Sequence, residues 1–129
     1  MTAPHPVLRR IGQLLSALVA LALFADGATG LFAPAKLASE MAASGWPLQL
    51  APVIGGITLA CAILYAIPRL AVLGAILVTG FLGGAICTHL RLGEVGSPPQ
   101  LICIALGAMT WGGLYLRDER LRRLLPYAL

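Results

Sequence analysis

The stretch RLAVLGAILVTGFLGGAICTHLR, residues 69–91, indicates the fold class of this chain. It is an apolar run with an arginine at each end, and a helix of this length, rising about 1.5 Å per residue, crosses the hydrocarbon core of a bilayer. Its interior glycines are too many for a water-soluble helix chosen for helix propensity. In a membrane, the Gly80-xxx-Gly84 spacing lets neighbouring helices approach closely. We therefore predict a transmembrane helix around which the other apolar segments pack.

The composition of the whole chain also indicates a membrane protein. Of its 129 residues, 59% are hydrophobic and 11% are charged, and the mean hydropathy is +0.90. A soluble domain averages roughly 25% charged residues, so this chain has too few to cover a water-exposed surface. The formal charge of +4 comes from cations placed between apolar runs, a pattern of membrane topology rather than of nucleic-acid binding. We expect one membrane domain, residues 1–129, with the lipid bilayer as partner and no nucleic acid.

The apolar runs and their connections predict an all-α, integral membrane four-helix up-down bundle. The connection at Pro68 is so short that the second and third spans must be antiparallel neighbours. The paired prolines at 98 and 99 stop one element and start the next. A basic tail follows the last span at 117–129. The expected spans are residues 11–32, 48–67, 70–89 and 100–116.

The first span has an alternative interpretation as a secretory signal peptide. Arg9 and Arg10, followed by the apolar residues 14–25, resemble the charged and hydrophobic regions of such a leader. No soluble domain follows for export, and the later spans need packing partners. We therefore expect the first span to stay in the bundle.

Lys and Arg predict the orientation of the bundle. Four spans place both termini on one side, and seven arginines belong to that side: Arg9, Arg10, Arg69, Arg117, Arg120, Arg122 and Arg123. The opposite side has only Lys36 and Arg91. Short loops rich in Lys and Arg stay in the cytoplasm, so we expect a cell (inner) membrane protein with both termini cytoplasmic.

Small residues inside the spans predict where the helices contact one another. Gly and Ala let helix backbones approach closely in a membrane, where large side chains would separate them. The predicted packing glycines are Gly56, Gly80, Gly84 and Gly107.

The candidate site is a group of polar residues at the outer side. Asp26 is the one acidic residue well inside an apolar span, where a charge costs at least about 2.5 kcal/mol at the bilayer centre. It either caps a kink at Gly27 or pairs with a cation, or it binds a ligand or a proton. The predicted topology places five further polar residues on the outer side of the membrane, slightly further out than Asp26. They would frame an outward-facing pocket for an anionic or carbonyl-bearing ligand: Lys36, Glu40, His89, Arg91 and Glu94. The alternative is that these are ordinary interfacial side chains.

Helix geometry ranks two of these candidates. On a regular helix Arg91 falls on the same face as Gly80 and Gly84, whereas His89 points nearly opposite. Both side chains reach one pocket only if the helix ends or unwinds near residue 88. We therefore rank Arg91 above His89. On the fourth span, Trp111 shares a face with Gly107 and would provide an aromatic wall for a lipid or quinone ring, or pack in the bundle.

Several chemistries have no motif in this chain. The glycines lie inside spans rather than in a phosphate-binding loop, and no His pair or carboxylate pair is spaced for a metal. Cys61, Cys87 and Cys103 form no CxxC motif, although Cys87 and Cys103 lie near the outer surface, where a disulfide is conceivable. We predict no catalytic residues and no metal site, and we expect a binding or accessory protein rather than an enzyme.

Several segments resemble the DoxX-like family of small four-helix membrane proteins. The resemblance rests on the residue Lys36 and on four segments: Gly45-Trp46-Pro47, AILYAIPR at 62–69, LGAILVTGFLGGAICTHLR at 73–91 and WGGLYLRD at 111–118. The resemblance implies a four-helix bundle with cytoplasmic termini. It implies no single activity, but some relatives are similar to membrane subunits of quinone-linked sulfur oxidation. No catalytic motif of the family carries over to this chain.

Three functional hypotheses follow from these observations. The first is an accessory membrane protein that binds a quinone or another lipid-like molecule in an outward-facing polar pocket and supports a redox partner subunit. The second is a proton-coupled small-molecule transporter that uses Asp26 and acts as a homo-oligomer, such as a dimer. The third is a purely structural membrane subunit.

Overall fold

The computed structural model describes residues 5–124, and within that range every regular element is helical. The all-α prediction is confirmed. The elements in chain order are α1 (Pro6–Phe32), η1 (Pro34–Leu37), α2 (Ala38–Ser44), η2 (Leu48–Leu50), α3 (Ala51–Ala66), η3 (Pro68–Leu70), α4 (Ala71–Arg91), α5 (Pro98–Arg117) and α6 (Glu119–Leu124). The predicted basic tail contributes α6, and its residues 125–129 lie outside the described part.

Within residues 5–124, four helical segments are long and apolar enough to cross a membrane, as predicted. They are Pro6–Phe32, Leu48–Ala66, Pro68–Arg91 and Pro98–Arg117. The first begins at Pro6 rather than at residue 11, because proline suits the first helical turn and the His5 side chain accepts a hydrogen bond from the Val7 amide. The two middle spans are separated by a turn at Ile67, whose extended backbone suits a residue before proline.

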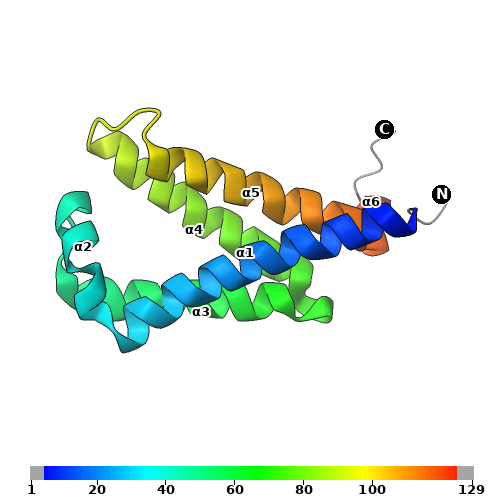
Figure 1. Cartoon of the computed structure of the whole chain (residues 1–129), viewed down its shortest axis with the longest axis horizontal. Helices are drawn as coiled ribbons and strands as arrows, with labels where there is room; N and C mark the ends of the chain where they lie inside the picture. Colours follow the sequence, from blue (N-terminus) through cyan, green and yellow to red (C-terminus); the bar gives the residue numbers. More distant parts are fainter. Residues whose placement is uncertain (1–4, 125–129) are drawn as a thin grey trace.

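The four spans form an up-down bundle. α1 and α4 each pack against both α3 and α5, so the order around the bundle is α1, α3, α4, α5. Figure 1 shows the pair α1 and α3 converging with the pair α4 and α5 at the end where α6 lies. The two pairs diverge toward the other end, which carries α2. We refer to these as the α6 end and the α2 end.

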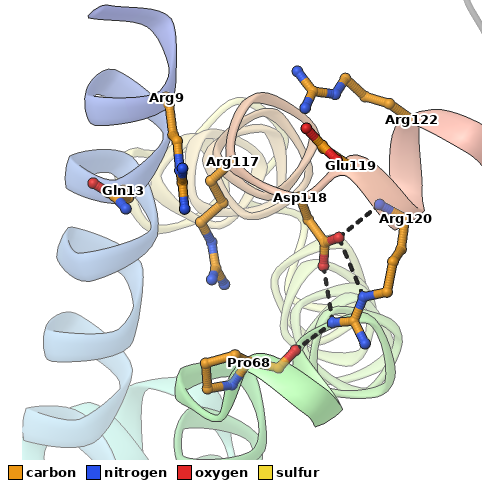
Figure 2. A pocket seen from close by; sticks show the side chains of 8 residues that line it. All are labelled: Arg9, Gln13, Pro68, Arg117, Asp118, Glu119, Arg120 and Arg122. Carbon is orange, nitrogen blue, oxygen red and sulfur yellow. Dashed lines mark hydrogen bonds and ion pairs between the residues drawn. The ribbon is translucent and has the colours of Figure 1, made fainter. Parts of the chain in front are cut away.

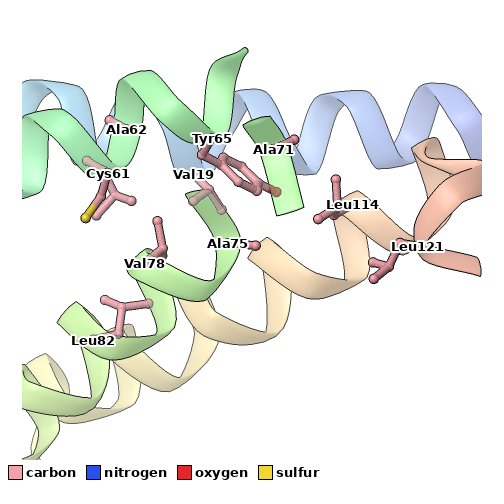
Figure 3. Close-up of a cluster of buried hydrophobic side chains, with 11 residues drawn as sticks. Val19, Cys61, Ala62, Tyr65, Ala71, Ala75, Val78, Leu82, Leu114 and Leu121 are labelled. Atoms are coloured by element: carbon pink, nitrogen blue, oxygen red, sulfur yellow. The ribbon is translucent and has the colours of Figure 1, made fainter. Parts of the chain in front are cut away.

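The buried core runs between the spans and is built mostly from small and branched side chains (Figure 3). Its members are Val19, Leu23, Cys61, Ala62, Tyr65, Ala71, Ala75, Val78, Leu82, Leu114 and Leu121. Leu121 belongs to α6, so the start of the basic tail packs onto the bundle. Large apolar side chains such as Leu21, Ile63 and Ile76 are instead exposed at the surface of the spans. An exposed apolar surface of this extent is expected where lipid is the solvent.

Glycines allow the closest helix contacts, but at other positions than predicted. A Cβ added at Gly27 would lie 2.7 Å from the Leu59 amide nitrogen of α3, and one at Gly55 would lie 2.7 Å from the Leu31 amide nitrogen of α1. Between α1 and α5, a Cβ at Gly12 would lie 2.8 Å from the Gly113 carbonyl oxygen. These distances are too short for any side chain, so glycine is required at these contacts.

None of the four packing glycines predicted from the sequence lies at one of these close contacts. A Cβ at Gly56, Gly80 or Gly84 would have nothing within 4 Å among the residues that the structure describes. At Gly107 it would make only an ordinary contact, 3.8 Å from Leu82 Cδ1. Their spacing suits helix packing, but α3 and α4 are rotated so that Gly56, Gly80 and Gly84 face away from the neighbouring helices.

Candidate functional site

A cavity of about 660 Å³ opens at the α2 end, where the helix pairs diverge. α1, α3 and α4 form its walls, and α2 covers it. Most of its lining is apolar, with Trp46, Ile54, Ile57 and Phe81 among the larger side chains. The volume lies within the usual range for small-molecule sites, roughly 300–1,000 Å³, which are mostly apolar with a few placed polar groups.

The polar part of the lining is acidic apart from one histidine and two hydroxyls. Asp26 of α1, Glu40 of α2 and Glu94 of the loop between α4 and α5 supply three carboxylates. His89 Nδ1 lies 2.8 Å from Glu94 Oε2. Because a carboxylate only accepts, this bond places the proton on Nδ1 and leaves Nε2 as the ring nitrogen for another partner. The structure thus brings together four of the residues expected to frame the pocket: Asp26, Glu40, His89 and Glu94.

The glycines of α4 make room for this cavity. Gly80 and Gly84 line it, and their missing side chains leave its wall open. The lining residues of α4 run from Gly80 through Phe81 to His89, and at 100° per residue they cover about half of the helix circumference. Because the cavity meets half of the helix circumference, Gly84 and His89 both line it although their side-chain directions differ widely.

Arg91 does not line the cavity, which reverses the predicted ranking of Arg91 above His89. α4 stays helical through Arg91, and the guanidinium Nη2 donates to the Ser44 carbonyl oxygen at 3.0 Å. This bond joins the end of α4 to the end of α2. Gly45 closes α2 with a φ of 77°, and a Cβ there would lie 3.1 Å from Arg91 Nη2, so glycine serves both the turn and the contact.

Two other predicted residues also lie away from the cavity. Lys36 is exposed on η1, and its side chain has no hydrogen bond or ion pair among the described residues. The Trp111 indole donates to Thr79 Oγ1 at 2.7 Å and packs beside the buried core, joining α5 to α4. With Lys36 and Arg91 elsewhere, no Lys or Arg among the described residues lines the cavity, so its charge favours a neutral or cationic head group over an anionic one.

A buried polar network near the α6 end was not predicted from the sequence. Ser16 Oγ and Tyr65 Oη are 3.0 Å apart, and Tyr65 Oη donates to the Thr110 carbonyl oxygen at 2.7 Å. Arg117 Nε donates to Ser16 Oγ at 2.8 Å, and its guanidinium stands over the Tyr65 ring, 5.4 Å from the centroid. The signal was available, because an up-down bundle puts the start of the first span level with the ends of the second and fourth.

The cysteines and other potential ligands form no metal or redox site in the described range. Cys61, Cys87 and Cys103 are all free thiols, so Cys87 and Cys103 are not paired. Among residues 5–124, no three His, Cys, Asp or Glu side chains gather in a way that would hold a metal ion.

Residues 14–113 match the family model described as the DoxX-like family. The chain belongs to the DoxX-like family. No curated protein and no solved structure matches it. Family membership and four apolar helices identify a multi-pass membrane protein.

The DoxX-like match covers the two ends of the bundle unequally. Every residue that lines the cavity at the α2 end, from Asp26 to Pro99, falls inside it. At the α6 end, Arg69 falls inside it, whereas Arg9, Arg117, Arg120 and Arg122 fall outside it. The match assigns no ligand to either end.

Proposed function

We propose that this DoxX-like protein is an accessory membrane protein that binds a quinone or a similar lipid-like molecule in the cavity at the α2 end. The observation that carries the proposal is an apolar cavity of about 660 Å³ with the His89–Glu94 pair in its wall. A quinone has an apolar ring and tail with two polar oxygens. Such a molecule needs a mainly apolar site with a small number of hydrogen-bonding groups.

In the proposed binding mode, the apolar part of the ligand contacts the apolar lining and its oxygens contact the polar lining. Ile54, Ile57 and Phe81 contact the ring and tail. Glu94 fixes the His89 tautomer, so neutral His89 accepts a hydrogen bond at Nε2 from a quinol hydroxyl. Protonated His89 instead donates from Nε2 to a quinone carbonyl. The same ring therefore serves both redox forms of the ligand, and a partner subunit carries out the redox reaction.

The proposed orientation places this cavity on the outer side of the inner membrane. Arg9, Arg117, Arg120 and Arg122 share the α6 end, and Arg91 and Lys36 belong to the α2 end. The positive-inside rule then favours a cytoplasmic α6 end. A quinone would enter from the outer leaflet, between the diverging helix pairs.

Thermal stabilisation of the purified protein by a short-tailed quinone tests the proposal. We expect the quinone to raise the melting temperature of the wild type, and Gly84→Leu to abolish the rise. The new side chain fills the cavity, while a Cβ at Gly84 meets nothing within 4 Å. Gly83→Leu is the matched control, because Gly83 is equally open but does not line the cavity. No rise in the wild type, or an equal rise in both variants, would refute quinone binding at this site.

A second candidate function is proton-coupled export of a cationic amphiphile, favoured by the acidic lining. Asp26 would exchange a proton for the cation, with Glu40 adding negative charge at the mouth. Proteoliposomes with a pH gradient and a cationic dye test this function. Asp26→Asn should abolish gradient-driven dye movement, and Glu119→Gln at the α6 end should not. Dye movement that survives in Asp26→Asn excludes this role for Asp26.

The third candidate, a purely structural subunit, predicts neither response. It predicts co-purification with a partner subunit that Gly84→Leu and Asp26→Asn leave unchanged.

A further inference from the structure

A second cavity, of about 520 Å³, lies at the α6 end and is rich in arginine (Figure 2). Four arginines line it: Arg9, Arg117, Arg120 and Arg122. They come from α1, from the end of α5 and from α6, with Pro68 of η3 closing the opposite side. Residues from distant parts of the chain therefore place guanidinium groups around one space.

Asp118 neutralises one of the four arginines. Its Oδ2 lies 3.2 Å from Arg120 Nη2, and its Oδ1 accepts from the Arg120 amide at 2.8 Å. The same Arg120 Nη2 donates to the Pro68 carbonyl oxygen at 2.5 Å. Partial burial raises the pKa of Asp118, but hydrogen bonds and charge from Arg120, with charge from Arg117, outweigh it and hold the pKa below its usual value. Asp118 is therefore ionised at neutral pH and committed to Arg120.

The remaining charge in the lining is a positive excess. Arg9, Arg117 and Arg122 face only Glu119 as a further acidic group. Within the described residues, the side chains of Arg9 and Arg122 have no hydrogen bond or ion pair. Figure 2 shows Arg9 and Arg117 on the side of the cavity across from Asp118 and Arg120. Two uncommitted guanidinium groups therefore border a space that also holds Arg117.

The supporting structure fixes the Arg117 side chain and the helix that carries Arg122. Arg117 is fixed by bonds to Ser16 Oγ and to the Tyr65 carbonyl oxygen, at 2.8 and 3.4 Å. α6 is fixed by Leu121, which is only 3% exposed in the core. Guanidinium groups that border one space, one of them fixed, suit the oxygens of a phosphate, which arginine binds through parallel hydrogen bonds.

We propose that the cavity at the α6 end is a binding site for a phosphate group, with Arg9, Arg117 and Arg122 as its ligands. The group is carried either by the head of an anionic lipid or by free phosphate. A basic pocket between the ends of membrane helices lies at the level of lipid head groups, which makes a lipid the natural source. This site is independent of the cavity at the α2 end.

The test compares two double variants by binding to phosphatidylglycerol. The protein in neutral detergent is titrated with this lipid, with diacylglycerol of the same chains and with inorganic phosphate, and complexes are counted by native mass spectrometry. Arg9→Gln/Arg122→Gln removes two charges that line the cavity. Arg10→Gln/Arg123→Gln removes two charges from adjacent exposed positions that do not line it. Melting temperatures of both variants confirm that the bundle is intact.

We expect phosphatidylglycerol to bind the wild type and the Arg10/Arg123 variant, and to bind the Arg9/Arg122 variant at least about tenfold more weakly. Diacylglycerol should not bind at this site. Binding of inorganic phosphate with the same variant pattern identifies free phosphate as a sufficient ligand, and its absence identifies a lipid. Equal weakening in both variants, or no binding of either phosphate source, would overturn the proposal.

Discussion

Replacing two adjacent glycines of α3 by alanine separates a packing glycine from a neutral one. Gly55 faces α1, where an added Cβ would lie 2.7 Å from the Leu31 amide nitrogen and 2.8 Å from the Gly27 carbonyl oxygen. Gly56 is the next residue on the same helix, and a Cβ there meets nothing within 4 Å. Both changes have the same intrinsic effect on the helix, so any difference between them reports packing.

The structure gives the size of the expected difference. An ordinary Cβ contact begins near 3.4 Å, so Gly55→Ala must move α1 and α3 apart by about 0.7 Å. The obstacles are backbone atoms, which have no rotamer to change. Overpacking of this kind typically costs about 1–3 kcal/mol, against an intrinsic gain from alanine of up to about 1 kcal/mol. We expect Gly55→Ala to destabilise the protein by about 1–2 kcal/mol, and Gly56→Ala to be neutral or stabilising.

Unfolding in mixed micelles with increasing SDS, followed by tryptophan fluorescence and circular dichroism, measures the free energies. Trp111 is a useful reporter because its indole joins α5 to α4. The wild type and both variants are compared at the same detergent composition. If Gly56→Ala is the more destabilised, or if the two variants are equal, the close approach of α1 and α3 at Gly55 is wrong.

Two further predictions concern the polar groups near the α6 end. Tyr65→Phe removes the hydroxyl that hydrogen-bonds to the Thr110 carbonyl oxygen and to Ser16 Oγ, so buried partners lose a hydrogen bond. We expect the free energy of unfolding in the same SDS assay to fall by about 1–2 kcal/mol. An unchanged free energy of unfolding would contradict the buried network. Asp118 has a pKa below its usual value in the folded protein, so its contribution is present above about pH 4 and lost as pH falls through the lowered pKa. The stability difference between wild type and Asp118→Asn should therefore be constant from about pH 7 to 5 and shrink below about pH 4, whereas a difference that grows on acidification would contradict the assignment.

The spans were predictable because strong, local signals define them. A long apolar run has few folded alternatives, and Pro68 leaves too short a connection for anything but antiparallel neighbours. Proline in the first turns of α1 and α5 marks their starts. Each of these signals acts within a few residues, so no tertiary information is needed to interpret it.

The rotation of each helix was not predictable from the same signals. The Gly80-xxx-Gly84 spacing shows that one face of α4 carries small residues, but it does not show what packs against that face. Rotation is decided by contacts such as Gly74 of α4 against the Tyr65 backbone of α3, which involve both partners. The small-residue face of α4 consequently lines a cavity instead of packing against another helix.

The candidate site was predicted in part. The length of the side chains explains which residues were predicted correctly to line the cavity and which were not. Asp26, Glu40 and His89 lie on helices whose depth follows from topology, and they meet in the cavity. Arg91 and Lys36 have long side chains whose partners depend on loop geometry. Arg91 turns to the Ser44 carbonyl because Gly45 ends α2 there.

The two ends of the bundle are held together to different degrees, and this bears on how a ligand reaches the cavity. Near the α6 end, hydrogen bonds of Tyr65 and Arg117 join α1, α3 and α5. At the α2 end, the one side-chain hydrogen bond between elements in the described range is that from Arg91 to Ser44. The cover of the cavity is thus attached by that bond and by the buried Met41 side chain. Elements with few buried contacts open at the lowest free-energy cost, so we expect displacement of α2 to widen the proposed entry between the diverging helix pairs, while the α6 end stays closed.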